Sequence, residues 1–155
     1  MIKIKNYFIR ILIMSEKNFK KLHGFFIEDL EVGQKAILKK KITEDDIYQF
    51  SKITGDNNPV HVDEDFAKQT IFKKRIAHGF LSASLISTVI ATKLPGPGSI
   101  YINQSLKFLA PVYIDEEISV NVVVLEINME KKRVKLLTEC FKSEKKYSLE
   151  KRKFW

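Results

Sequence analysis

The stretch Phe80–Lys93, with the sequence FLSASLISTVIATK, decides the fold of this chain. Nearly every position is apolar or small, and the only charged side chain comes at its end. A helix that is apolar almost all round is buried rather than laid on a surface. The break Pro95–Gly96–Pro97–Gly98 ends it. Small residues would let a curved sheet approach the helix closely, and these are Ser82, Ala83, Ser84 and Ser87.

Three segments that follow this helix alternate apolar and polar residues, as strands do. They lie at 100–108, 118–124 and 134–140, and turns are expected at 115–117 and 128–132. A long buried helix followed by a run of antiparallel strands is an α+β arrangement. We therefore expect a single α+β domain built around the central helix.

The chain before the central helix predicts one more strand and two shorter helices. The strand is expected at 35–42. Thr43 then caps a helix, with Asp46 at the capping-box position, and Gly55 ends it. A second short helix is expected over Asp63–Lys68, with its first residue as the cap.

Composition places the chain among globular proteins of one domain. It has 155 residues, of which 45% are hydrophobic and 30% charged. No apolar run reaches the roughly 18–20 residues that cross a membrane, so no membrane contact is expected. The single cysteine, Cys140, excludes an internal disulfide and a multi-cysteine zinc site. It is compatible with a reducing compartment, and a cytoplasmic location is expected.

The net charge of +8 leaves two interpretations open. Lysines make up 23 of the 27 basic residues and are spread along the whole chain. We find no base-stacking motif and no helix-turn-helix pattern, so nucleic acid is not an expected partner. The charge is then either a diffuse lysine surface or a preference for anionic ligands such as phosphates.

Both ends of the chain depart from the pattern of the middle. Residues 1–13 form an apolar, basic leader that we expect to lie outside the domain, with Met14 as the start. A signal peptide fits less well, because no small-residue cleavage site follows. A short amphipathic membrane contact is the alternative. The domain is expected to span 14–155, with Tyr147 and Leu149 in a short edge strand and the last residues frayed.

The second informative stretch is Ser51–His61, with the sequence SKITGDNNPVH. It places the carboxylate of Asp56 and the imidazole of His61 five residues apart, on a turn stiffened by Pro59. A carboxylate beside an imidazole is suited to moving protons on and off a bound water. Gly79 stands where the central helix begins, and a backbone N–H at a helix start stabilises negative charge on an oxygen.

Each of these residues also has a structural interpretation. An aspartate after a helix often only hydrogen-bonds the local backbone, and a lone histidine is more often packed than catalytic. We expect His78 to be structural and Asn58 to fix the turn or to orient a carboxylate or a water. Ser87 is either a packing residue or active-site support. Metal binding is not expected, because the spacing of the possible ligands matches no standard site; these ligands are Asp56, His61, Asp63 and His78.

Three blocks of the sequence together resemble the MaoC-like family of (R)-specific enoyl-CoA hydratases, which have the hot-dog fold. They are Ser51–His61, Ile76–Gly79 and Leu94–Tyr101, and the resemblance covers roughly residues 24 to 140. It implies a curved antiparallel sheet wrapped around one long helix. It also implies that Asp56 and His61 are the catalytic pair, that Gly79 is the backbone donor to the thioester carbonyl, and that Ser87 lies in the active site.

The activity implied by the resemblance is reversible hydration of trans-2-enoyl-CoA to (R)-3-hydroxyacyl-CoA. Coenzyme A then enters as part of the substrate, and no further cofactor is expected. The resemblance also implies a homodimer. Two alternatives stay open at this point, which are a hot-dog acyl-CoA thioesterase and a non-catalytic acyl-CoA-binding module.

Overall fold

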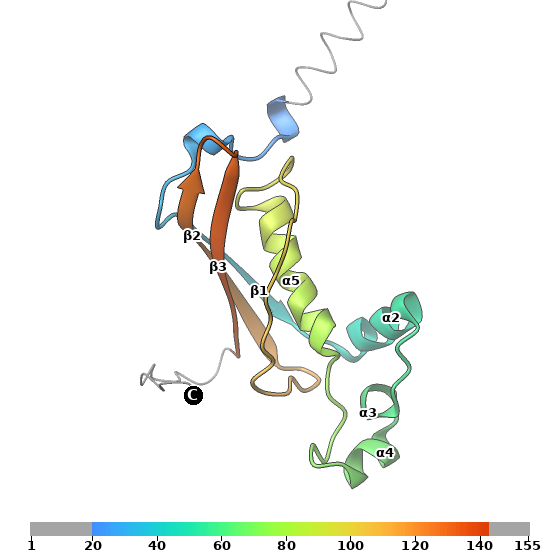
Figure 1. The fold of residues 1–155 in the computed structure, drawn as a ribbon. Helices are drawn as coiled ribbons and strands as arrows, with labels where there is room; N and C mark the ends of the chain where they lie inside the picture. The colour runs from blue at the N-terminus through green and yellow to red at the C-terminus, as the bar shows by residue number, and fades with distance from the viewer. Residues whose placement is uncertain (1–19, 143–155) are drawn as a thin grey trace, which may run out of the picture.

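A computed structural model of the chain describes residues 20–142. Two expectations therefore lie outside the described residues, namely the leader at 1–13 and the short edge strand at Tyr147 and Leu149. Within the described range the chain forms one antiparallel sheet, one long helix and a group of short helices (Figure 1).

The sheet has three antiparallel strands in the order β1, β2, β3. Their bounds are β1 Lys35–Lys41, β2 Glu117–Asn128 and β3 Arg133–Lys142. The long helix α5, Gly79–Thr92, lies against one face of the sheet (Figure 1). This α+β arrangement of a curved antiparallel sheet on a single long helix is the expected hot-dog fold.

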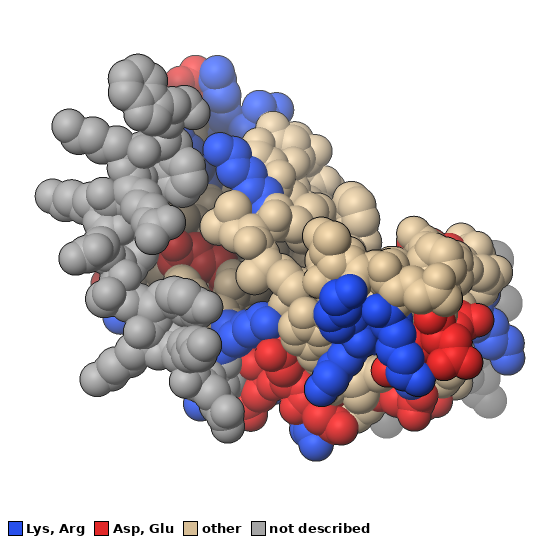
Figure 2. All heavy atoms as spheres, turned by 90° about the horizontal axis from the view of Figure 1, so that it is seen from below, with Lys and Arg blue, Asp and Glu red and all other residues tan. Residues whose placement is uncertain are grey.

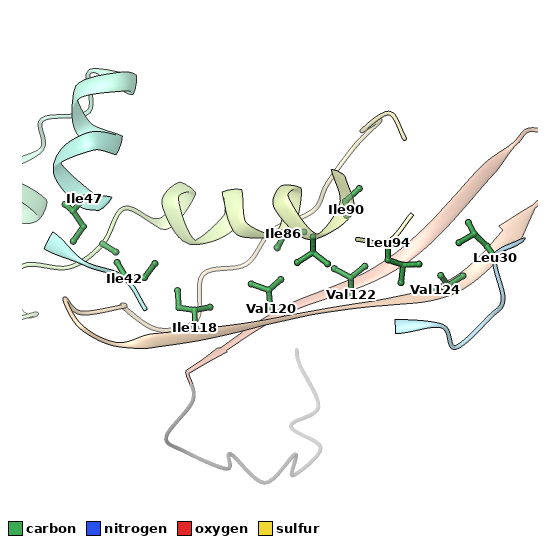
Figure 3. Packing of buried hydrophobic residues seen from close by; sticks show 12 residues of the cluster. Leu30, Ile42, Ile47, Ile86, Ile90, Leu94, Ile118, Val120, Val122 and Val124 are labelled. Carbon is green, nitrogen blue, oxygen red and sulfur yellow. The ribbon is translucent and has the colours of Figure 1, made fainter. Parts of the chain in front are cut away.

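The core lies between β2 and α5. Alternate residues of β2 are buried, and their side chains point toward the helix (Figure 3). From the helix side, Ile86 and Ile90 complete this layer. Burial of each such side chain stabilises the fold by about 1.5–3 kcal/mol, so this layer fixes the position of α5 on the sheet. The buried residues of β2 are Ile118, Val120, Val122 and Val124.

Three short helices gather beyond the first turn of α5 (Figure 1). They are α2 Glu44–Thr54, α3 Pro59–Val62 and α4 Glu64–Gln69, and a 3-10 turn η1 at Ile27–Asp29 precedes β1. The predicted capping box of Thr43 and Asp46 is present at the start of α2. Gly55 ends this helix in the left-handed conformation, with φ of 77°. Asp63 caps α4, as predicted.

One predicted strand is wrong. Residues 100–108, all within the described range, run extended but form no ladder with another strand. The alternation of apolar residues is real, but a strand also needs a partner for its backbone, and residues 100–108 pair with none of the described strands. Its contact with β3 is a side-chain bond, from Gln104 Nε2 to Thr138 Oγ1 at 3.1 Å.

The prediction that α5 is buried on all sides is also wrong. Ile86, Val89 and Ile90 are buried, whereas Phe80 is 66% exposed and Ser84, Ser87 and Thr88 lie at the surface. A three-stranded sheet covers only one side of a helix, so the other side stays open in the single chain. None of the helices within residues 20–142 combines the length and the apolar character that a membrane span requires.

Charge is nearly balanced over the described part of the chain. Residues 20–142 contain 18 of the 27 basic and 16 of the 19 acidic residues, so most of the net charge of +8 belongs to the two ends of the sequence. On the face seen in Figure 2, basic and acidic side chains lie next to one another. The diffuse-lysine interpretation therefore describes the domain better than a general attraction for anions.

Candidate active site

Asp56 stands in the turn that follows α2, with its side chain exposed. Its backbone carbonyl accepts hydrogen bonds from the buried Ser51 hydroxyl at 2.9 Å and from His78 Nε2 at 2.9 Å. Its carboxylate accepts from the backbone N–H of Asn58 at 3.3 Å. The backbone is thus anchored from two sides, while most of the carboxylate remains accessible to a ligand.

His61 lies on α3 rather than in a loop, because Pro59 starts this helix and Asn58 caps it by accepting from the N–H of Val60 at 3.2 Å. The half-buried ring has its Nδ1 2.8 Å from the carbonyl oxygen of Ile76. A carbonyl oxygen only accepts, so Nδ1 carries the proton in this bond. In the neutral ring Nε2 is then unprotonated and free to act as a base.

His78 connects the two residues. It is 2% exposed, its Nε2–H donates to the carbonyl of Asp56, and its ring lies 3.9 Å from the ring of His61 between centroids. Its Nδ1 is buried without a hydrogen-bond partner among the described residues. A buried polar atom without a partner costs about 1–3 kcal/mol, so His78 holds its position at a cost that its bond to Asp56 helps to offset.

Gly79 begins α5, and the first N–H groups of a helix have no partner within the helix. The ring of Phe108 lies over this residue, since a Cβ added at Gly79 would come within 3.0 Å of it. Phe108 also packs against Phe80, with ring centroids 5.7 Å apart. Glycine at this position therefore leaves room for an aromatic wall beside an exposed backbone donor.

The side-chain ligand atoms of Asp56, His61 and His78 all lie within 4.8 Å of one another. One water that forms hydrogen bonds of about 2.8 Å bridges two atoms at such a separation. The carboxylate and a ring nitrogen of His61 can thus hold a single water between them, and Nε2 is the ring nitrogen that the bond to Ile76 leaves open. The same spacing can hold a metal ion, although both histidines already use one ring nitrogen in a hydrogen bond.

The environment of His61 lowers its pKa below the ordinary value. Burial of the ring is the largest cause, and the neighbouring His78 acts in the same direction. The hydrogen bond to Ile76 and the charge of Asp56 oppose the shift without cancelling it. The unprotonated ring that acts as a base is therefore present at lower pH than in a free histidine.

The structure does not gather every predicted residue. Asn58 fixes the turn as the cap of α3, which is one of its two predicted roles. Ser87 is exposed eight residues along α5 from Gly79, about 12 Å by the rise of a helix, so its role remains a prediction. Asp63 caps α4 by accepting from the N–H of Phe66 at 2.9 Å and is not one of the residues grouped with Asp56.

Sequence reasoning missed two members of the site. The Ile76 carbonyl fixes the tautomer of His61 across 15 positions of sequence, and Phe108 reaches Gly79 from a segment predicted as a strand. A backbone carbonyl leaves no signature in a sequence. Phe108 left no signal of this contact either, because its segment has the apolar alternation of a strand.

Comparison with known proteins identifies the family to which this chain belongs. The sequence profile described as "MaoC like domain" matches residues 29–145. The (R)-specific enoyl-CoA hydratase of Rhodospirillum rubrum is 54% identical over 77% of this chain and 81% of its own length. This chain belongs to the MaoC-like domain family. The matched region contains Asp56, His61, His78 and Gly79.

Two further proteins are similar to this chain in sequence and in structure. The 3-hydroxybutyryl-CoA dehydratase of Methylorubrum extorquens is 50% identical over 77% of this chain and 76% of its own length. Among solved structures, the unliganded R-hydratase of Pseudomonas aeruginosa superposes with a TM-score of 0.73 at 47% identity, covering 77% of each chain. The hot-dog fold is thus shared with a hydratase whose structure is known.

Proposed function

We propose that this MaoC-like protein is an (R)-specific enoyl-CoA hydratase, which adds water reversibly to trans-2-enoyl-CoA. The observation that carries the proposal is the water-sized gap between the Asp56 carboxylate and His61, beside the free N–H at the start of α5. The names of the relatives supply the acyl-CoA substrate and the R configuration. No cofactor is needed beyond the coenzyme A part of the substrate.

The reaction needs a base, a proton donor and a site for negative charge. Nε2 of His61 takes a proton from the water held against Asp56, while the water oxygen bonds to C3 of the alkene. The π electrons move toward the thioester oxygen, where the N–H of Gly79 stabilises the developing charge. The enolate then takes a proton at C2 from the Asp56–His61 pair, which restores both groups. Such acid–base assistance is worth about 10²–10⁴ in rate.

The proposed quaternary state is a homodimer. Apolar side chains stand exposed along the unpaired segment, including Ile100 at 86% and Leu109 at 80%. They adjoin the open side of α5 through the contact of Phe80 with Phe108. An apolar surface that includes an unpaired extended segment needs a cover, and a second copy of the chain supplies the same surface.

The single free cysteine suits the cytoplasm as the proposed location.

Loss of the alkene absorbance of crotonyl-CoA tests the proposed function, together with chiral analysis of the product. A hydratase yields (R)-3-hydroxybutyryl-CoA and releases no thiol. A thiol reagent included in the assay separates this outcome from a thioesterase, which would release free coenzyme A. Binding of the thioester with neither change would instead identify a non-catalytic module and contradict the proposal.

A further inference from the structure

A hollow of about 440 Å³ lies beside the segment that joins α4 to α5. The run Lys73–Lys74–Arg75 lines it together with the aromatic rings of Phe72 and Tyr113. Glu64 and Glu116 also line it. Its volume is within the usual range of small-molecule sites, about 300–1,000 Å³. The combination of aromatic rings with several cations suits a ligand that carries both a flat ring and phosphates.

Most charges at this hollow are already paired. Arg75 bonds to Glu44 and Tyr48, and its Nε lies 3.5 Å from Glu64. Glu116 lies 2.8 Å from the Nζ of Lys142. By contrast, Lys73 and Lys74 are exposed, and neither has an acidic partner among the described residues. Two positive charges are therefore left for a ligand.

The hollow adjoins the catalytic cluster. Lys74 precedes Ile76 by two residues, so their Cα atoms lie at most about 7 Å apart. The carbonyl of Ile76 holds His61 at 2.8 Å. A ligand that reaches the cluster through a flexible arm can thus rest its other end in the hollow.

The backbone at Lys73 is strained, with φ of 63° in a residue other than glycine. Glycine or asparagine occupies this left-handed region more easily. A substitution of Lys73 by asparagine should therefore not destabilise the fold.

We propose that this hollow binds the nucleotide end of coenzyme A. The phosphates lie against Lys73 and Lys74, and the adenine ring lies against Phe72 and Tyr113. The pantetheine arm then runs past Ile76 to bring the thioester to Gly79. This inference rests on the proposed function for the identity of the carrier, but it concerns affinity and leaves the chemical step unchanged.

A double variant, Lys73→Asn with Lys74→Gln, tests the subsite. We expect its KM for crotonyl-CoA to rise at least about fivefold, with kcat unchanged, because exposed charge pairs are individually weak. Its kcat/KM for crotonyl-N-acetylcysteamine, which lacks the nucleotide, should stay within twofold of wild type. Its melting temperature should not fall, since asparagine relieves the strain at position 73. Higher salt should raise the wild-type KM for the CoA thioester only.

The matched control is Lys131→Gln with Lys132→Asn. This pair lies in the β2–β3 hairpin, at the end of the molecule away from α3 and α4 (Figure 1), and Lys132 also has a positive φ, of 48°. It removes the same charge and relieves the same kind of strain. We expect its KM for crotonyl-CoA to match that of wild type. An equal rise of KM in both double variants would mean that lysines anywhere on the surface attract the anionic substrate. That result would overturn the proposed subsite.

An unchanged KM for crotonyl-CoA in the Lys73/Lys74 variant would also overturn the proposed subsite. So would a loss of kcat/KM for the N-acetylcysteamine thioester as large as the loss for crotonyl-CoA. If wild type hydrates neither thioester, the proposed function fails, and calorimetry with free coenzyme A still decides the subsite. The proposal then requires binding by wild type, weaker binding of 3′-dephospho-CoA, and at least about fivefold weaker binding of coenzyme A by the variant.

Discussion

The ring of His61 is held on three sides by groups that come from different parts of the chain. The Ile76 carbonyl fixes the proton on Nδ1, the ring of His78 lies against its face, and the Asp56 carboxylate stands within 4.8 Å of a ring nitrogen. Each contact acts on one property of the base, namely its tautomer, its orientation and its charge. A histidine without these neighbours would spend part of its time in the wrong tautomer.

The lowered pKa of His61 predicts the pH profile. We expect the acid limb of kcat/KM for hydration to have its midpoint below 6.5, the ordinary pKa of histidine, because burial disfavours the protonated ring. NMR titration of the His61 ring should give the same midpoint. If the acid limb has its midpoint at or above pH 6.5 and coincides with the NMR titration of His61, the lowered pKa of His61 is contradicted.

The same shift has a consequence for stability. A histidine whose pKa is lower in the folded chain binds fewer protons folded than unfolded between that pKa and 6.5. The contribution of His61 to the free energy of unfolding is therefore complete above pH 6.5 and is lost as the pH falls through the folded pKa.

His78 is predicted to be a positioning residue. In His78→Gln the side-chain amide can still donate to the Asp56 carbonyl, whereas His78→Leu keeps the bulk and removes the donor. We expect kcat to fall about tenfold in the leucine variant, with KM little changed, and much less in the glutamine variant. In both, the acid limb should move to higher pH, since His78 lowers the pKa of His61. Equal kcat in both variants would exclude the positioning role.

At the scale of elements, the start of α5 supplies the proposed donor to the thioester oxygen. Gly79 is the first residue of the helix, where proline is tolerated, and His78 before it has φ of −57° and ψ of 135°, which proline also allows. Gly79→Pro therefore removes the N–H with little damage to the helix. Gly79→Ala adds the same Cβ near Phe108 but keeps the N–H.

We expect kcat for Gly79→Pro to lie about 10²–10³-fold below that of Gly79→Ala, the usual effect of losing one oxyanion donor. Circular dichroism and melting temperature check that α5 is intact in both variants. Equal kcat in the proline and alanine variants would show that this N–H does not stabilise the transition state.

Elements with local signals were predictable from the sequence. The start of α2 is specified by Thr43 and Asp46 and its end by Gly55, all within one turn of the boundary they define. The cap of α4 is equally local. α5 was predicted within one residue at each end, because its apolar run is long and is followed by prolines and glycines. The motif around Asp56 and His61 is also local, and the catalytic roles of these two residues stay a prediction.

What could not be predicted depends on contacts between distant residues. Residues 100–108 have the pattern of a strand, but only the arrangement of the other strands decides whether they find a partner. His78 reaches the carbonyl of Asp56 across 22 positions of sequence. The residues that flank His78 in the chain gave no sign of this contact. The apolar sequence of α5 correctly predicted that the helix packs against the sheet, but the single chain covers only one side of the helix.

At the scale of the whole molecule, the exposed apolar surface on residues 100–109 and α5 predicts association. We expect wild type to sediment as a dimer and Ile102→Asp to sediment as a monomer with reduced hydratase activity, because a carboxylate in an apolar interface is unpaired. Val32→Asp is the control, since Val32 is equally exposed in the turn before β1. A monomeric wild type, or equal behaviour of both variants, would contradict a dimer through this surface.

The central claim is that Asp56 and His61 hydrate an enoyl thioester together. Asp56→Asn keeps the backbone bonds to Ser51 and His78, and His61→Gln keeps a donor near Ile76, so both variants should fold. The most direct measurement is kcat for crotonyl-CoA hydration by each purified variant, with melting temperature as the check on folding. We predict a fall of at least about 10²-fold for each at nearly unchanged stability. Activity within threefold of wild type in either folded variant would contradict the claim.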